Sequence, residues 1–405
     1  MKRLLFIPFI LLIILPKGTS QHNLSGQKKV EIPFQYENNF IIVNIVFNKI
    51  LHFKFIFDTG AEYTILAKRE YADLLGIKYD KEFKIIGADM STELTAYLAR
   101  GINLKVGDIE NPHQDFLVLG DDYFKFEALT GVKVHGILGA NFFSRYIVKI
   151  DYRKRVITLY DPQYFVPPKG FEEIPISVYK HKPYIQVDSK LFASDSTSRI
   201  KLLIDSGASL TLLIYTDTDA ALRLPEKVVR ANIGQGLGGF IKGSMGRFYE
   251  INLGPFPLKD LVASYQEVYA SMDTSEMNSR NGLLGNMILS RFDVIINYYQ
   301  QKMYLKPNKN YKKGFKFDRS GMIFLASGKK LNTYTINYVV PGSPADEAGI
   351  MEGDQIKQVN GLSVKFLTMT NIVRKLQGKV GKKIKIRLSR NGEKIKITFN
   401  LREII

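Results

Sequence analysis

The sequence of 405 residues has no cysteine and little histidine. The absence of cysteine excludes disulfides, thiolate metal sites, iron–sulfur clusters, a cysteine nucleophile and a lipid anchor on an N-terminal cysteine. The five histidines are scattered, with no pair at the H-x-x-x-H spacing: His22, His52, His113, His135 and His181. Nothing in their spacing indicates a metal site or a Ser-His-Asp triad, so we expect neither a metal nor a cofactor.

The excess of positive charge is concentrated near the C-terminus. The formal net charge is +18, of which residues 311–405 contribute +12, with 19 Lys and Arg against 7 Asp and Glu. Such a region can face solvent, an acidic partner, nucleic acid or an anionic membrane surface. A solvated, lysine-rich surface is the simplest interpretation. Contact with an anionic membrane surface stays open as the alternative, and nucleic acid is not an expected partner.

The first 20 residues are typical of an export signal. Two basic residues precede an apolar run over residues 4–15, and the small residues Gly18 and Ser20 follow it. The run is short for a membrane span, and its flanks fit a secretory signal that is cleaved near Ser20. An uncleaved N-terminal anchor is the alternative. In either case the sequence predicts an exported protein, in a periplasm or at the cell surface.

The middle of the chain contains an internal duplication. Residues 55–66 (FIFDTGAEYTIL) align with residues 202–213 (LLIDSGASLTLL) at an offset of 147. Residues 136–139 (GILG) align with residues 282–285 (GLLG) at an offset of 146. A third pair, Ile-Gly at residues 86 and 233, keeps the same order and spacing. Three landmarks in one order indicate two homologous lobes.

Each lobe is expected to be mostly β, because its apolar and β-branched runs are short and bounded by Gly, Asn, Asp and Pro. Proline-containing and lysine-rich segments mark the connections between domains. The predicted division is a signal peptide over residues 1–20, lobes over residues 32–162 and 172–308, and a C-terminal domain over residues 320–405.

Each copy of the first landmark places an aspartate directly after a predicted buried strand. Asp58 and Asp205 both follow three apolar residues and begin a D-[ST]-G triplet. A single triplet of this kind is typical of a turn that closes a strand. A carboxylate at the end of a buried strand is costly to desolvate unless it has a partner. Two such aspartates on paired lobes could face each other, which predicts two carboxyls that share one proton.

These motifs resemble those of aspartic peptidases over about residues 35–310, and the lobes are more similar to the retroviral type than to pepsin. The resemblance implies an all-β fold with two pseudo-symmetric β-barrel lobes. It also implies an endopeptidase that hydrolyses polypeptides with a water activated between Asp58 and Asp205. Support of the catalytic loops is assigned to Thr59, Gly60, Ser206 and Gly207.

A catalytically silent peptide-binding scaffold with the same fold is the rival hypothesis. The two intact triplets argue against it, because a protein that only binds has no reason to hold two buried carboxyls together.

Glycine-containing segments resemble the flaps of the family: Gly87 in lobe one, and Gly234, Gly236, Gly238 and Gly239 in lobe two. Residues 234–239 also satisfy the G-x-G-x-x-G pattern of dinucleotide-binding loops, which requires a helix to follow. Residues 240–246 contain two more glycines and no helical period, so the flap interpretation is favoured. The region over residues 86–91 is poorer in glycine, so two equal flaps are not expected.

Alanine follows both triplets, at Ala61 and Ala208, as in retroviral enzymes. Pepsin-like enzymes usually have Ser or Thr there, and its hydroxyl donates to the carboxylate. Without that donor the ionised dyad is less stabilised, so the dyad is expected to titrate at higher pH.

Residues 320–405 resemble a PDZ domain of the type attached to bacterial proteases. The matching segments are residues 339–345 (VVPGSPA), 348–350 (AGI), 353–354 (GD) and 359–361 (VNG). We expect helices over residues 344–348 and 368–377, and a hairpin around residues 391–392.

The PDZ resemblance implies a domain that binds the C-terminal end of a peptide. The amides expected to hold its carboxylate are those of Gly321, Met322, Ile323 and Phe324. A domain that only packs on the peptidase is the alternative.

Overall fold

The computed structural model describes residues 24, 26–87, 92–121, 123, 126–236, 238–267 and 280–405. The predicted export signal and residues 88–91 of the predicted lobe-one flap lie outside the described residues. Among the described residues, no helix is both long enough and apolar enough to cross a membrane.

Lobe one, residues 29–160, consists mostly of strands rich in Val, Ile and Phe. Buried and exposed residues alternate along its first strand, as expected when one face of a strand is covered. Asn38 and Asn39 form the first hairpin turn with positive φ angles of 45° and 65°, which asparagine tolerates better than most residues. The elements are β1 (Lys29–Glu37), β2 (Phe40–Phe47), β3 (Leu51–Phe57), β4 (Thr64–Leu66), α1 (Arg69–Leu74), β5 (Lys81–Ile86), β6 (Glu93–Val106), β7 (Ile109–Leu119), α2 (Phe126–Thr130), β8 (Gly136–Leu138), α3 (Ala140–Phe143), β9 (Ile147–Asp151) and β10 (Val156–Tyr160).

Lobe two, residues 172–307, follows after a 3₁₀ turn, η1 (Pro162–Tyr164). Its elements are β11 (Glu172–Pro175), β12 (Ser177–Tyr179), β13 (Lys182–Lys190), β14 (Ser198–Ile204), β15 (Leu212–Tyr215), β16 (Val228–Gly236), β17 (Gly239–Leu253), β18 (Phe256–Gln266), β19 (Gly282–Leu284), α4 (Asn286–Leu289), β20 (Phe292–Asn297) and β21 (Lys302–Pro307).

The same strand pairings occur in both lobes. β3 runs parallel to β8 in lobe one, and β14 runs parallel to β19 in lobe two. The next pair is also equivalent, because β4 runs parallel to β7 and β15 to β18. In each lobe, therefore, the strand that leads to the aspartate lies beside the strand that carries the later Leu-Gly.

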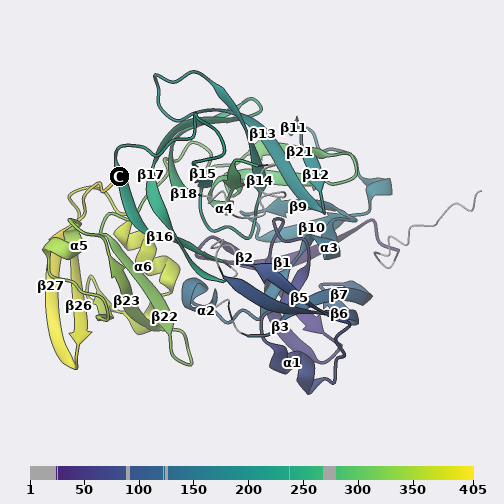
Figure 1. Cartoon of the computed structure of the whole chain (residues 1–405), viewed down its shortest axis with the longest axis horizontal. Coiled ribbons are helices and arrows are strands. Elements are labelled where there is room, and N and C mark those ends of the chain that lie inside the picture. The colour runs from purple at the N-terminus through teal and green to yellow at the C-terminus, as the bar shows by residue number, and fades with distance from the viewer. Residues whose placement is uncertain are drawn as a thin grey trace, which may run out of the picture.

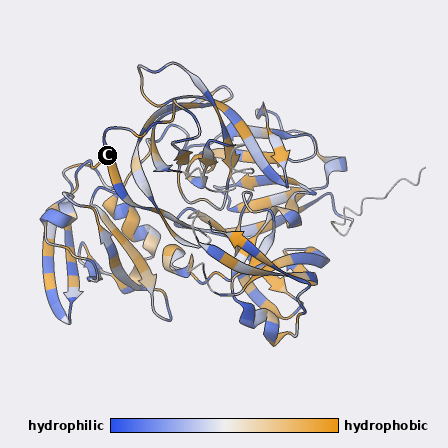
Figure 2. Ribbon diagram, viewed as in Figure 1, coloured by the Kyte–Doolittle hydropathy of each residue, from blue (hydrophilic) through white to orange (hydrophobic). Residues whose placement is uncertain are grey.

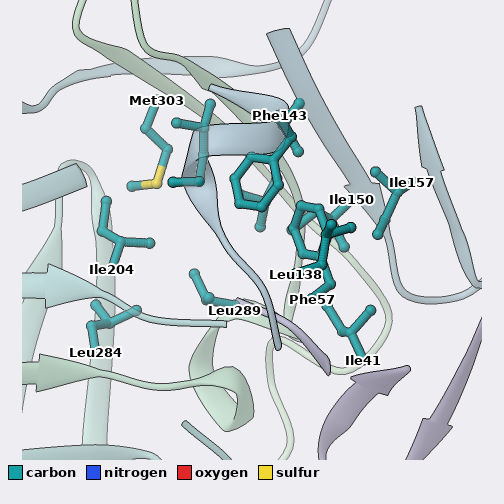
Figure 3. Close-up of a cluster of buried hydrophobic side chains, with 14 of the residues drawn as sticks. Ile41, Phe57, Leu138, Phe143, Ile150, Ile157, Ile204, Leu284, Leu289 and Met303 are labelled. Atoms are coloured by element: carbon teal, nitrogen blue, oxygen red, sulfur yellow. The ribbon is translucent and has the colours of Figure 1, made fainter. Parts of the chain in front are cut away.

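One sheet joins the lobes. β9 pairs with β20 in antiparallel fashion, with Ile150 opposite Val294, and β10 and β21 continue the sheet on either side. Side chains from both lobes meet in one buried cluster beneath the joined strands, including Phe57 and Leu138 of lobe one and Ile204 and Leu284 of lobe two (Figure 3). This shared core fixes the two aspartate-bearing strands relative to each other.

The C-terminal domain has its own hydrophobic core and combines strands with two short helices. The predicted helices and hairpin are present, and Thr368 caps the longer helix by accepting the N–H of Asn371. The elements are β22 (Met322–Ser327), β23 (Thr333–Val339), α5 (Pro344–Glu347), β24 (Gln355–Val359), β25 (Leu362–Ser363), η2 (Val364–Phe366), α6 (Met369–Leu376), β26 (Lys383–Arg390) and β27 (Glu393–Asn400). The predicted fold class, all-β with a C-terminal α+β PDZ domain, is confirmed.

The C-terminal domain lies against both lobes, with β22 beside α2 and with β26 and β27 at the edge farthest from the lobes (Figure 1). β22 is also one of the two edge strands of its sheet, with β27 at the other edge.

Candidate active site

Two equivalent loops carry the predicted catalytic aspartates. Asp58 directly follows β3 and Asp205 directly follows β14. The N–H of Asp58 donates to the carbonyl of Leu138 at 3.1 Å, and the N–H of Asp205 donates to the carbonyl of Leu284 at 3.0 Å. β8 and β19 thus hold the start of each loop.

The two carboxyls face each other across the lobe boundary. A Cβ built on Gly60 would lie 2.7 Å from Cγ of Asp205, and one built on Gly207 would lie 2.3 Å from Cγ of Asp58. Each carboxyl therefore lies directly over the glycine of the opposite loop, where no side chain fits. Because of this placement, the charge of Asp205 acts directly on Asp58.

Thr59 and Ser206 lock the two loops together from beneath. The hydroxyl of Thr59 donates to the carbonyl of Ile204 at 2.7 Å and accepts the N–H of Ser206 at 3.0 Å. The hydroxyl of Ser206 donates to the carbonyl of Phe57 at 2.9 Å and accepts the N–H of Thr59 at 3.0 Å. Both side chains are fully buried, so these four bonds are shielded from water.

Backbone amides supply the donors to each carboxylate. Oδ1 of Asp58 accepts the N–H groups of Gly60 and Ala61 at 2.7 and 3.1 Å. Oδ1 of Asp205 accepts those of Gly207 and Ala208 at 2.8 and 2.9 Å. Because Ala61 and Ala208 have no hydroxyl, neither contributes a side-chain hydrogen bond to the carboxylates.

Burial raises the pKa of both carboxyls. For Asp58 the negative charge of Asp205 is the second cause, and its pKa lies well above the usual value. Two influences lower the pKa of Asp205 against this effect of burial: its hydrogen bond to Asp58 and the positive charge of Arg280. Both side chains remain partly accessible to solvent. The site can therefore retain a proton at mildly acidic pH and still admit water and a substrate.

The later Leu-Gly elements pack directly beneath the loops. A Cβ on Gly139 would lie 2.2 Å from the carbonyl oxygen of Tyr63, and one on Gly285 would lie 2.3 Å from that of Leu210. Only glycine allows this approach of two backbones.

Sequence reasoning missed Asn286, which joins the two lobes under the dyad. Its side-chain NH₂ donates to the carbonyls of Ser206 and Asn39, both at 2.8 Å, and its oxygen accepts from the hydroxyl of Tyr152. The equivalent position in lobe one is Ala140. The only signal in the sequence is the duplication, because Asn286 stands where the other copy has alanine, directly after the repeated Leu-Gly.

We expect Asn286→Leu to lower kcat about tenfold while KM for a peptide stays nearly constant, because Asn286 positions Ser206 and does not touch the carboxyls. The change also leaves buried polar groups without partners, at a cost in unfolding free energy of about 2 kcal/mol. Steady-state kinetics and chemical denaturation measure the two effects. Tyr152→Phe, which leaves the bond to Ser206 intact, is the control and should retain most of kcat. Equal losses of kcat in both variants would contradict a positioning role for Asn286.

The predicted lobe-two flap is a hairpin. β16 and β17 pair up to Gly236 opposite Gly239, and Gly238 and Gly239 turn the chain with φ of 98° and 125°. A strand follows the glycines, so the helix that a dinucleotide-binding loop requires is absent from this position. In lobe one, the N–H of Gly87 donates to the carbonyl of Thr92 at 2.8 Å.

The predicted carboxylate loop of the PDZ domain is partly used within its own turn. The carboxylate of Asp318 accepts the N–H groups of Ser320 and Gly321 at 2.9 and 2.8 Å, and the N–H of Met322 donates to the hydroxyl of Ser320 at 3.2 Å. Burial raises the pKa of Asp318 to about 6. Two of the four predicted amides, those of Gly321 and Met322, are thus already engaged. Ile323 and Phe324 follow them in β22.

The PDZ domain contacts lobe one through the first hairpin turn. The N–H of Asn38 donates to the hydroxyl of Thr370 at 3.0 Å, and that hydroxyl donates to Glu37 at 3.0 Å. The side chain of Asn38 donates to the carbonyl of Leu129 in α2 at 2.8 Å. One turn therefore ties α6 to α2, with β22 alongside.

The PDZ domain also contacts the base of the lobe-two hairpin. Val340 and Ile405 are buried together with Val229 of β16. The hydroxyl of Tyr338 donates to the carbonyl of Arg230 at 3.2 Å.

Family models match both parts of the chain. Residues 43–142 and 194–288 match the aspartyl protease family, and residues 335–390 match the PDZ domain family. The first match covers both aspartate loops.

Curated relatives match shorter stretches. A probable CtpA-like serine protease of Staphylococcus saprophyticus is 29% identical over 147 residues, which is 35% of this chain and 29% of that protein. The carboxy-terminal processing protease CtpA of Bacillus subtilis is 47% identical over 53 residues, 13% of this chain and 11% of that protein. A putative zinc metalloprotease of Lactococcus lactis is 36% identical over 72 residues, 18% of this chain and 16% of that protein.

The chain spans less than a third of the length of these relatives. Their names agree on proteolysis but differ in catalytic type, so they do not assign one to this chain. The matched families and the geometry together describe a protease-related chain with two aspartyl-protease segments and a C-terminal PDZ domain.

Proposed function

We propose that this protein is an exported aspartic endopeptidase that hydrolyses polypeptides with a water activated between Asp58 and Asp205. The observation that carries the proposal is the reciprocal placement of the carboxyls, each over the glycine of the opposite loop. Four buried hydrogen bonds through Thr59 and Ser206 maintain that placement. A scaffold that only binds peptides gains nothing from holding two carboxyls in repulsive contact.

The proposed reaction needs one proton on the pair. The ionised carboxyl takes a proton from the bound water as the water oxygen attacks the carbonyl carbon of the peptide bond. The protonated carboxyl donates its proton to the carbonyl oxygen, so the tetrahedral intermediate carries no net charge of its own. As the intermediate collapses and the C–N bond breaks, the carboxyl that took the water proton donates it to the leaving nitrogen, and the other carboxyl takes a proton from one hydroxyl of the intermediate, so the pair again holds one proton. The pair as a whole, and not one fixed aspartate, holds the proton.

The lobe-two hairpin is proposed to cover the substrate above the dyad. Ile233 of β16 packs with Leu213 and Tyr215 of β15, the strand that follows the Asp205 loop. Gly236, Gly238 and Gly239 carry no side chains, so their backbone groups can approach the main chain of an extended peptide.

The pH dependence of hydrolysis tests the catalytic type. The rate should fall at low pH, where both carboxyls are protonated and no base is left, and at high pH, where both are ionised and no acid is left. Because burial raises both pKa values, we expect the optimum at roughly pH 5–7. Ala61→Ser combined with Ala208→Ser adds a donor beside each carboxylate and should move the whole profile toward acid.

The measurement is kcat/KM for a fluorogenic peptide across the pH range, with a fluorophosphonate reagent as a probe for a reactive serine. A rate that rises steadily into the alkaline range, together with a covalently labelled serine, would favour a serine protease like those among the relatives. An optimum near about pH 3, or a double variant with an unshifted profile, would show that the hydrogen-bond argument is wrong.

A further inference from the structure

The two last strands of the PDZ domain present a strongly basic surface. Alternate residues of β26 and β27 point away from the core. The resulting set, here called the basic face, consists of Lys383, Lys385, Arg387, Lys394 and Lys396. All five are exposed. These strands lie at the edge of the molecule farthest from the lobes (Figure 1), and hydrophilic and hydrophobic residues alternate along them (Figure 2).

The charges on the basic face are not balanced within the chain. Arg387 lies directly opposite Lys396 in the β26–β27 register, and like charges at such positions repel. None of the five side chains has a carboxylate within salt-bridge distance in the part of the chain that the structure describes. By contrast, Arg390 at the end of β26 is paired with Asp354 at 2.7 Å. An external anion would relieve the repulsion on this face.

A pocket of about 380 Å³ adjoins the basic face. Arg387, Lys394 and Lys396 line it, and Lys357 and Lys365 add two further cations. Apolar side chains, including that of Leu388, contribute to the wall, and among the residues that the structure describes no Asp or Glu lines the pocket.

Two large apolar side chains beside this pocket are exposed. Phe366 is 87% exposed and Leu362 is 51% exposed. Both adjoin the segment Ser363 to Lys365 that lines the pocket. Exposed phenylalanine beside clustered lysines is costly in water, and it is the combination found on proteins that bind at a membrane interface.

We propose that the basic face, together with Phe366 and Leu362, is a docking surface for a lipid bilayer with anionic headgroups. Lysine and arginine meet the phosphates, and the two apolar side chains enter the interfacial layer. An acidic peptide would match the charge but would leave the projecting Phe366 in water. The opposite side of the domain already contacts the lobes through α6 and β22. Docking on the bilayer would thus place the peptidase lobes on the side away from the membrane.

The first experiment uses the absence of tryptophan from the chain. Phe366→Trp provides a single fluorophore at the proposed insertion point. The protein is taken from Gln21 onward, so that the apolar run over residues 4–15 cannot bind lipid. With vesicles of phosphatidylglycerol and phosphatidylcholine, the emission should shift to the blue and be quenched by brominated acyl chains. Tyr179→Trp, at an exposed position in lobe two, is the control and should show neither change.

The second experiment measures how much protein co-sediments with the same vesicles. Each cation at the surface contributes about fivefold to the partition coefficient, so Lys394→Gln combined with Lys396→Gln should lower it by about 25-fold. Lys78→Gln combined with Lys105→Gln, which removes the same charge from exposed positions in lobe one, should leave binding nearly unchanged. Raising the salt from about 0.1 M to about 0.5 M should also weaken binding.

Three outcomes would overturn the proposal. The first is equal binding to vesicles of phosphatidylcholine alone, which would remove the role of charge. The second is equal loss of binding in both lysine pairs, which would remove the role of this surface. The third is salt-sensitive binding to soluble polyglutamate without binding to vesicles, which would assign the basic face to an acidic polypeptide.

Discussion

Asp58→Asn or Asp205→Asn should lower kcat/KM for a polypeptide substrate by at least about 10³-fold, because each change removes either the general base or the general acid. Asparagine has nearly the same shape as aspartate and can accept the same backbone N–H groups through its carbonyl oxygen. The four bonds of Thr59 and Ser206 lie beneath the carboxyls and do not depend on their charge. The loss should therefore be chemical and not structural.

Thermal stability provides the control for this prediction. The pKa of each carboxyl is raised by burial in the folded protein. Ionisation is thus harder in the folded state than in the unfolded state, and the dyad lowers stability as the pH rises through its folded-state pKa values. Removing one carboxyl should leave the melting temperature at neutral pH unchanged or raise it. A well-folded Asp205→Asn protein that still hydrolyses peptides at a substantial rate would refute the assignment.

Gly207→Ala should lower kcat/KM by at least about 100-fold, because its Cβ would lie 2.3 Å from Cγ of Asp58. The carboxyl must move by about 1 Å to relieve this contact, which separates it from Asp205 and from the bound water. Gly60→Ala should act in the same way but less severely, since its Cβ would lie 2.7 Å from Cγ of Asp205.

Gly314→Ala is the matched control for the glycine series, because nothing lies within 4 Å of the added Cβ. It should retain full activity, as measured with the same peptide. If Gly207→Ala kept nearly full activity, the carboxyls would not face each other in the working enzyme as they do in this structure.

The sequence predicted the fold through features that are local. Period-two patterns and turn residues such as Asn38 and Asn39 are sufficient to specify strands and hairpins. The aspartate loops were predictable because the duplication showed the same triplet twice, at Asp58 and Asp205. The duplication also predicted that the two aspartates could face each other, but it did not indicate the β9–β20 pairing that joins the lobes.

Other features could not be predicted because they depend on contacts between distant segments. Asn286 contacts Asn39 across 247 positions of the chain, and no local pattern marks that pair. Asn38 and Thr370 are 332 positions apart. Asp318 lies close in sequence to the amides that it occupies, those of Ser320 and Gly321. Aspartate is common in turns, however, so its position alone did not indicate that it would take an amide predicted to bind a ligand.

The position of α2 beside β22 has a thermodynamic consequence. PDZ domains bind a peptide by adding it as a strand to a sheet edge, and β22 is the edge strand that α2 accompanies. If such a peptide displaced α2 from β22, it would compete with the contacts that hold α2, among them the bond from Asn38 to Leu129. Its apparent affinity would be reduced by the fraction of molecules in the undocked state. By reciprocity, such a peptide would loosen α2, whose Phe126 packs in the same cluster as Ala61 beside Asp58. Peptide binding at β22 and docking of α2 would then be linked equilibria, and each would change the free energy of the other by the same amount.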